Sequence, residues 1–365
     1  MPKYIHLYIN APDESHIFPA EGNVSLATIL DRATEKNDDH ISICLPGNIA
    51  EQQLPWIVRT VRNLIRGQNE LVVLNVFGFS RGGALAFLLA KKLENISDLR
   101  LQMNIAVIDP VPVSYFLQLH GDLIFGTCNS LASSVADLSQ CHYLNKALVL
   151  LTVCRAERQS ANEVAFQSPI LPVFPVNCRV DVDVMPGLHQ FAVRFSLING
   201  VLGSRNMEST ASYLRILQFM HACGAQFDFN QLGLREIGMH PSFLTMNSSL
   251  ESLYNCLLDR LYVDTFGLPQ TWLSQHSLFA RNLHTSYLNF HHKQLVGERL
   301  SLIGIAMTDG DDDCMLQVSN TPMFQLRTWE MRKSVFCLQL AFLYAVVWGI
   351  NKILFAEVER VGLRM

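Results

Sequence analysis

Residues 71–84 read LVVLNVFGFSRGGA, and this stretch decides the fold. The nearly continuous apolar run from Leu71 to Phe77 is typical of a strand that is buried on both faces of a parallel sheet. The pattern Gly-x-Ser-x-Gly follows at 78–82, and residues 84–93 read as a helix. This order of strand, turn and helix predicts that Ser80 lies on a sharp turn at the carboxyl edge of the sheet.

The glycines around Ser80 suit a nucleophile turn, because side chains beside such a strained backbone would clash with the strand and the helix. The turn also points the amino end of the following helix at the oxyanion of a tetrahedral intermediate. Arg81 follows the serine, so we expect its backbone N–H to be one oxyanion donor. A phosphate-binding loop is disfavoured, because no Gly-Lys-Ser/Thr follows the glycines.

The first two hundred residues alternate between apolar segments of strand length and segments with helical spacing. The expected strands are residues 4–9, 41–45, 71–77, 103–108, 147–153 and 180–184, the last of them an edge strand. The expected helices are residues 24–36, 51–66 and 84–93. This order predicts an α/β fold with an α/β-hydrolase-like, mostly parallel sheet flanked by helices.

After about residue 205 the pattern becomes mainly helical. We therefore predict three units: an α/β-hydrolase catalytic domain over 1–205, a mainly helical cap or second domain over 206–333, and an apolar helix over 334–356. The stretch 334–350 has 17 residues without a charge, which is the lower limit for a membrane span. A buried core helix is the favoured interpretation, and a membrane-associating helix with aromatic anchors stays open.

Ser80 needs a histidine base, and the histidine needs an acid that fixes its tautomer. His189 lies just after the expected strand 180–184, in a loop at the carboxyl end of a late strand, and is our candidate base.

Two carboxylates are candidates for the acid. Asp109 directly follows the buried strand 103–108 and is favoured, because an aspartate there projects at the same sheet edge as Ser80. Glu157 follows the strand 147–153 and is nearer to the usual topological position of the acid. If neither is the acid, Asp181 and Asp183 come next.

At these residues the chain resembles the catalytic domain of bacterial type VI secretion phospholipase effectors and, more loosely, the class 3 lipases. Residues 78–83, GFSRGG, are similar to that family's GFSRGA motif. IDPV at 108–111 resembles the family's aspartate-containing strand end. AER at 156–158, followed by FQSP at 166–169, resembles its DERR…FxP stretch, and PGLH at 186–189 resembles its PGxHSDVGG histidine motif. The resemblance covers about residues 1–205 and carries over Ser80, Asp109 and His189 as catalytic positions.

The chain departs from the family pattern at two places. Gln190-Phe191-Ala192 follows His189 where the family has Ser-Asp-Val-Gly-Gly, and Asn10-Ala11-Pro12 replaces an aspartate-glycine motif after the first strand. The resemblance implies hydrolysis of carboxylic esters, including those of phospholipids, by a secreted bacterial effector. Such an effector stays in the bacterial cytoplasm until a specialised machine exports it to the cytosol or membrane of a target cell.

Composition limits the other classes of function. The 365 residues carry a formal net charge of −4 and no basic run interleaved with aromatics, so we do not expect nucleic acid as a partner. Nine scattered cysteines without a CxxC pair argue against a disulfide framework or a structural zinc site. The first residues lack the charged start and long apolar run of a Sec signal peptide.

The sequence therefore predicts a serine esterase or lipase that acts on a lipid or acyl-ester substrate without a metal or organic cofactor. Two alternatives stay open. One is a catalytically inactive interaction protein on a hydrolase scaffold, which the missing glycines after His189 motivate. The other is an acyltransferase that uses the same triad.

Overall fold

The structure is a computed structural model. It describes residues 2–10, 23–47, 50–67, 70–96, 100–112, 129–153, 169–187, 192–198, 201–203, 207–228, 231, 254–261, 263 and 294. His189, Glu157 and the apolar segment 334–356 lie outside these ranges.

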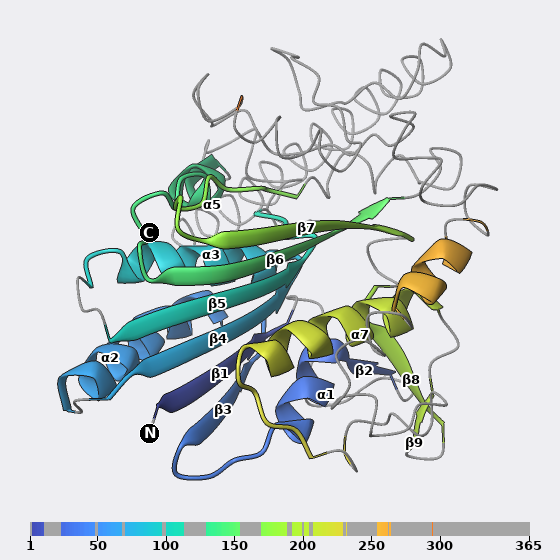
Figure 1. The fold of residues 1–365 in the computed structure, drawn as a ribbon, viewed down its shortest axis with the longest axis horizontal. Helices are drawn as coiled ribbons and strands as arrows, with labels where there is room; N and C mark the ends of the chain where they lie inside the picture. Colours follow the sequence, from blue (N-terminus) through green and yellow to red (C-terminus); the bar gives the residue numbers. More distant parts are fainter. Residues whose placement is uncertain are drawn as a thin grey trace, which may run out of the picture.

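Six parallel strands form the central sheet (Figure 1). They are β1 (Lys3–Ile9), β3 (His40–Leu45), β4 (Val72–Phe79), β5 (Leu101–Ile108), β6 (Leu144–Val153) and β7 (Arg179–Pro186). Their order across the sheet is β3-β1-β4-β5-β6-β7. The predicted α/β fold with a mostly parallel sheet is confirmed, and β7 is an edge strand as expected.

Helices cover both faces of this sheet (Figure 1). The helices α2 (Ala50–Gly67), α3 (Arg81–Leu93) and α5 (Asn129–Val135) pack on one face, and α1 (Leu26–Ala33) and α7 (Met207–Ala222) pack on the other. Crossovers between parallel strands are right-handed. The chain moves in one direction across the sheet from β1 to β3 and in the other direction afterwards, so α1 lies on the opposite face of the sheet from α2 and α3.

The direction reverses between β1 and β4, and this position is a topological switch point. Ligands of such sheets bind at a switch point, at the carboxyl ends of the strands.

Burial on both faces explains why the central strands are apolar throughout. All eight residues of β4 are buried, and seven of the eight in β5 are. Helix α3 adds a face of alanines and leucines that lies directly on β4 and β5. These elements form one hydrophobic core beneath the turn that carries Ser80.

A row of polar side chains crosses the sheet within this core. His6, Asn75 and Asn104 sit on three adjacent strands and have no exposed surface. Asn104 Nδ2 donates to Asn75 Oδ1 at 2.8 Å, and Asn75 Nδ2 donates to the carbonyl of Cys223 at 3.0 Å. The row therefore fixes the register of the strands and anchors the residues that follow α7.

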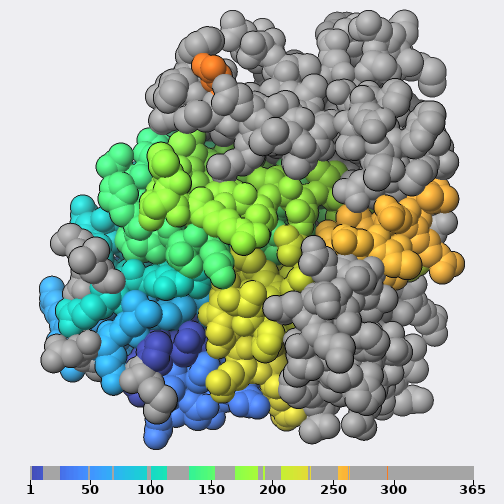
Figure 2. Space-filling view, in the orientation of Figure 1, coloured from blue at the N-terminus to red at the C-terminus, as the bar shows by residue number. Residues whose placement is uncertain are grey.

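Helix α7 packs on one face of the sheet. It lies beyond residue 205, where we expected the catalytic domain to end. Figure 2 shows α7 in yellow over this face of the sheet. The chain after α7 continues along α1, because Asp228 N donates to the carbonyl of Ala33 at 2.7 Å. The α/β layers thus include residues up to 228.

A second, small sheet of three antiparallel strands lies beside α1. It comprises β2 (Asn23–Ser25), β8 (Arg194–Ile198) and β9 (Val201–Gly203) in the order β2-β8-β9. The sequence pattern did not predict these strands.

A helical segment at 254–261 contacts the middle of α7, where the guanidinium of Arg215 lies 5.9 Å from the ring centre of Tyr254. Within the described part of the chain, no helix has the length and apolarity to cross a membrane.

Candidate active site

Ser80 occupies the turn between β4 and α3 with a strained backbone. Its φ is 54° and its ψ is −124°, a combination that L-residues rarely adopt. Among the described residues other than glycine, only Ser80 and Asp109 have a positive φ. A serine held in this way at the end of a buried strand is the geometry that the Gly-x-Ser-x-Gly pattern predicts.

The glycines on either side of Ser80 allow strand, turn and helix to approach closely. A Cβ on Gly78 would overlap the carbonyl of Gly82. A Cβ on Gly82 would lie 2.5 Å from the carbonyl oxygen of Ile9, the last residue of β1. Helix α3 therefore begins directly against the ends of β4 and β1, and no side chain fits between them.

The segment after β5 is tied to the serine turn by backbone hydrogen bonds. Ser80 N donates to the carbonyl of Ile108 at 3.0 Å, and Val111 N donates to the carbonyl of Ser80 at 3.0 Å. A Cβ on Gly83 would lie 2.9 Å from the Cβ of Pro110. Gly83 stands where the family motif GFSRGA has alanine, and the missing methyl group leaves room for Pro110 over the first turn of α3.

Asp109 follows Ile108, which pairs with Phe79, so it is the neighbour of Ser80 on the adjacent strand. Its side chain is fully buried, and its carboxylate accepts hydrogen bonds from both the backbone N of Thr152, at 2.9 Å, and the Thr152 hydroxyl. Each carboxylate oxygen can accept more than one hydrogen bond. Thr152 on β6 therefore orients Asp109.

Arg81 begins α3, and its backbone N–H belongs to the first turn of that helix. Its side chain lies along the amino end of α2, where it pairs with Glu51 at 2.5 Å and donates to the carbonyl of Pro112 at 3.4 Å. The guanidinium is thereby occupied by protein groups, and the backbone N–H is the part of Arg81 that we expect at an oxyanion.

The lower-ranked acid candidates on β7 are held elsewhere. Asp183 pairs with Arg215 of α7 at 2.5 Å, and Asp181 lies 4.0 Å from the same guanidinium. Strand β7 is three strands from β4, a lateral distance of about 14 Å. These two carboxylates therefore hold α7 on the sheet, and the structure does not bring them to Ser80.

Two residues at the strand ends were not among the predicted site residues. Thr152 had a signal, since it is a hydroxyl residue within the apolar run 147–153. Asn10, which stands where the family has an aspartate-glycine motif, is buried at the end of β1 and accepts a hydrogen bond from Ser25 Oγ at 2.6 Å. Ser25 is the N-cap of α1, so Asn10 joins the end of β1 to the start of that helix.

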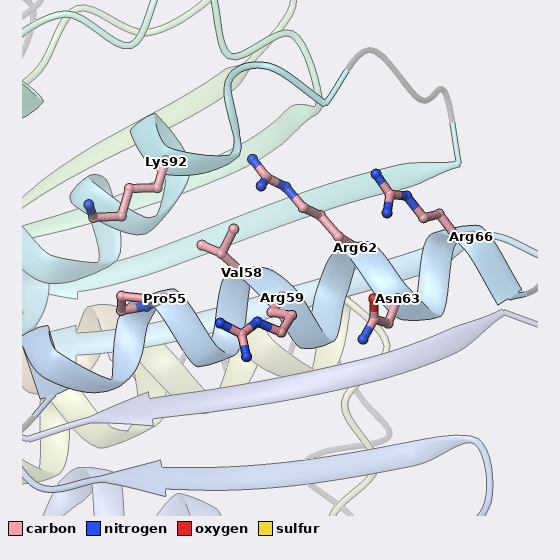
Figure 3. Close-up of a pocket in the computed structure, with 7 residues that line it drawn as sticks. All are labelled: Pro55, Val58, Arg59, Arg62, Asn63, Arg66 and Lys92. Atoms are coloured by element: carbon pink, nitrogen blue, oxygen red, sulfur yellow. The ribbon is translucent and has the colours of Figure 1, made fainter.

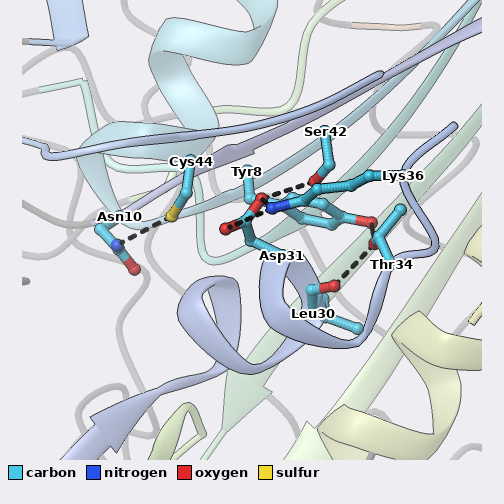
Figure 4. A network of polar contacts seen from close by, with 8 residues as sticks. All are labelled: Tyr8, Asn10, Leu30, Asp31, Thr34, Lys36, Ser42 and Cys44. Atoms are coloured by element: carbon cyan, nitrogen blue, oxygen red, sulfur yellow. Dashed lines mark hydrogen bonds and ion pairs between the residues drawn. The ribbon is translucent and has the colours of Figure 1, made fainter. Parts of the chain in front are cut away.

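Figure 4 shows the polar contacts between α1 and the strands β1 and β3 that continue from Asn10. Asn10 Nδ2 lies 3.7 Å from Cys44 Sγ, and burial is the main cause that raises the pKa of the Cys44 thiol to about 12. A thiol with that pKa holds its proton at neutral pH. Cys44 thus packs at this edge and does not compete with Ser80 as a nucleophile.

Comparison with known proteins does not assign a function to this site. No protein-family model and no curated protein matches the chain. The solved structure of an uncharacterized protein from Pseudomonas aeruginosa is similar at 14% identity and a TM-score of 0.42, over 88% of this chain. The matched region spans 64% of that protein's chain. The resemblance to secretion-system phospholipases therefore stays a prediction from the motifs.

Proposed function

We propose that the chain is a serine hydrolase of carboxylic esters with Ser80 as its nucleophile. The observation that carries the proposal is the backbone of Ser80, whose φ of 54° and ψ of −124° place the serine on a strained turn. That turn lies at the carboxyl end of a central strand beside the topological switch point. A fully buried strand and the first turn of α3 meet there, and backbone strain of this kind is retained where function requires it.

The proposed reaction has two halves. The Ser80 oxygen attacks the ester carbonyl while His189 takes the hydroxyl proton, and N–H groups at the start of α3 stabilise the oxyanion. Collapse expels the alcohol, which receives the proton from His189. Water then attacks the acyl-enzyme by the same route, and releases the carboxylic acid and free Ser80.

Asp109 is the proposed acid of this triad. It is buried next to Ser80, and two hydrogen bonds from Thr152 orient it. An acid in this role fixes the histidine tautomer and stabilises the imidazolium that forms during the reaction. The substrate class is an acyl ester, and the family resemblance extends this to phospholipid esters.

Labelling with a fluorophosphonate probe tests the proposal, because the probe reacts with activated serines. We expect the wild-type chain to be labelled and to hydrolyse a short-chain ester, and Ser80→Ala to lose both properties. Ser139→Ala is the matched control, since Ser139 lies in a turn on the opposite edge of the sheet, just before β6. It should be labelled like the wild type.

Absence of labelling in a folded wild-type chain would contradict the proposal and favour the interaction protein on a hydrolase scaffold. Labelling together with transfer of the acyl group to an added alcohol, in preference to water, would favour the acyltransferase. Product analysis with and without the alcohol separates these two outcomes.

A further inference from the structure

A basic groove lies on the face of the molecule formed by α2 and α3. It has a volume of about 450 Å³ and is lined by Pro55, Val58, Arg59, Arg62, Asn63, Arg66 and Lys92. Figure 3 shows that the three arginines project from α2 and that Lys92 comes from α3. The lining has four basic side chains and no acidic one, in a chain whose formal net charge is −4.

The arginines form one stripe along α2. At about 100° per residue, positions 59, 62 and 66 fall within an arc of about 60°, and they extend over about 10 Å of the helix. Like charges spaced by three and four residues destabilise a helix. A surface selected for stability alone would place acidic residues between them, so this stripe indicates an anionic partner.

Protein groups do not neutralise the stripe within the described residues. Neither the three arginines nor Lys92 takes part in an ion pair there. The nearby acidic residues are already engaged, since Glu51 pairs with Arg81 at 2.5 Å and Glu94 pairs with Lys91 at 2.8 Å.

Trp56 lies one turn before Arg59 on the same helix and is 51% exposed. An exposed tryptophan beside cationic side chains is typical of surfaces that meet the headgroup region of a bilayer. Arginine forks also match the oxygens of phosphate groups. Four separate cations along an open groove suit several headgroups better than one small anion.

We propose that this face, comprising Trp56, Arg59, Arg62, Arg66 and Lys92, docks on an anionic phospholipid bilayer. Docking does not depend on the chemistry proposed for Ser80. The pair between Glu51 and Arg81 joins the amino end of α2 to the residue after Ser80. A bilayer against α2 would therefore lie along the helix that leads to the serine turn.

Sedimentation with vesicles tests the docking on the full chain. We expect binding to phosphatidylcholine vesicles that contain phosphatidylglycerol, weaker binding as salt rises, and little binding to pure phosphatidylcholine. Each basic residue near an anionic surface strengthens binding by about fivefold. The triple variant R59Q/R62Q/R66Q should therefore bind about 100-fold more weakly.

The matched control is R32Q/K36Q/R179Q, which removes the same charge from exposed positions on α1, on the loop after α1 and on β7, away from the groove. It should bind within about threefold of the wild type, and both variants should remain folded at the temperature of the assay. Trp56→Ala should weaken binding to the anionic vesicles and leave the salt dependence unchanged.

Any of several results would overturn the proposal. The wild type could fail to bind anionic vesicles, both triple variants could lose binding equally, or the groove variant could bind as well as the wild type. Binding of a single-stranded oligonucleotide or of inorganic phosphate in place of vesicles would also overturn it, because the groove would then serve a soluble anion. Equal binding to neutral and anionic vesicles would assign membrane contact to apolar residues elsewhere in the chain.

Discussion

Ser80 and Asp109 directly follow the neighbouring strands β4 and β5. Both residues have a positive φ, of 54° and 41°, which L-residues rarely adopt. Both positions could be predicted because each follows an apolar strand directly, so a local pattern places it at the sheet edge. The contact of Asp109 with Thr152 could not be predicted, since it depends on the register between β5 and β6. That register includes an irregularity at Met103 and Asn104, which no sequence period reveals.

The close approach of Gly82 to the end of β1 can be tested by adding one methyl group. Gly82→Ala puts a methyl group 2.5 Å from the carbonyl oxygen of Ile9, with backbone on both sides of the contact. We expect it to lower the free energy of unfolding by about 1–3 kcal/mol, because neither element can move without disturbing the sheet. Denaturation in urea measures this change.

Gly67→Ala is the control for this comparison, because Gly67 ends α2 with nothing within 4 Å of an added Cβ. It should leave stability unchanged or raise it by less than about 1 kcal/mol. Equal effects at the two glycines would contradict the close packing of α3 on β1.

Single substitutions can also decide whether Asp109 or Glu157 is the acid of the triad. Asp109→Asn keeps the shape of the side chain but can favour the wrong histidine tautomer, a change that lowers turnover by about 10⁴ in serine proteases. We therefore expect Asp109→Asn to lose nearly all hydrolysis of a short-chain ester. Glu157→Gln should keep activity within about tenfold, which is about 1.4 kcal/mol of barrier.

Thermal melts must accompany these assays, because Asp109 also accepts two hydrogen bonds from Thr152 and its amide weakens them. Thr152→Val separates the two effects, since it removes the hydroxyl and keeps the carboxylate. The reverse activity pattern, with Glu157→Gln inactive, would move the acid to the end of β6.

At the scale of elements, the six strands and the helices α1, α2 and α3 follow from periodicity and from buried apolar runs. The small sheet does not, because its strands at 23–25 and 201–203 have three residues each, and β2 pairs with β8, which lies far away in the sequence. The buried polar row has a signal in the sequence as well. His6, Asn75 and Asn104 each interrupt an apolar run, and their strands turn out to be adjacent.

The ion pair between Arg215 and Asp183 helps to hold helix α7 on the sheet, and its contribution can be tested. Arg215 is 19% exposed and pairs with Asp183 at 2.5 Å, so Arg215→Gln leaves that carboxylate without its cation. We expect the free energy of unfolding to fall by about 1–3 kcal/mol. Chemical denaturation followed by circular dichroism measures the loss.

Arg179→Gln is the matched control on the same strand, since Arg179 is 74% exposed and lies 3.5 Å from Asp181. Its effect should stay below about 0.5 kcal/mol, as for most surface pairs. A larger loss at Arg179 than at Arg215 would refute the role of Arg215 in docking α7.

On the scale of the molecule, the change of pattern near residue 205 marks the end of strand and helix alternation, but not the end of the α/β layers. Helix α7 buries residues around most of its circumference, including Tyr213, Leu217 and Met220. A helix that is apolar on nearly all sides is packed within a core. The sequence carries that signal, but it does not indicate which sheet face receives the helix. The helix docks there through the Asn75 contact with Cys223, which joins positions 148 residues apart.

The buried row makes a prediction for the stability of the whole fold against pH. Burial, with a smaller contribution from His40, lowers the pKa of His6 to about 3, from 6.5 in a model peptide. Above pH 6.5 the imidazole is neutral in both states, and its contribution to stability is fully present. As the pH falls from 6.5 toward 3, the unfolded chain takes up a proton that the folded chain refuses, so stability is lost.

We therefore expect the free energy of unfolding to fall between pH 7 and pH 4.5, with a contribution from His6 of up to about 1.4 kcal/mol per pH unit. His6→Gln removes the titrating group and should reduce the slope by up to that amount, even if it lowers stability at pH 7. Burial is the main cause, so 0.5 M NaCl should leave the difference between the two slopes intact. Identical slopes in urea titrations of the two chains would show that His6 takes up its proton equally in the folded and unfolded states, which is incompatible with its buried place between β3 and β4.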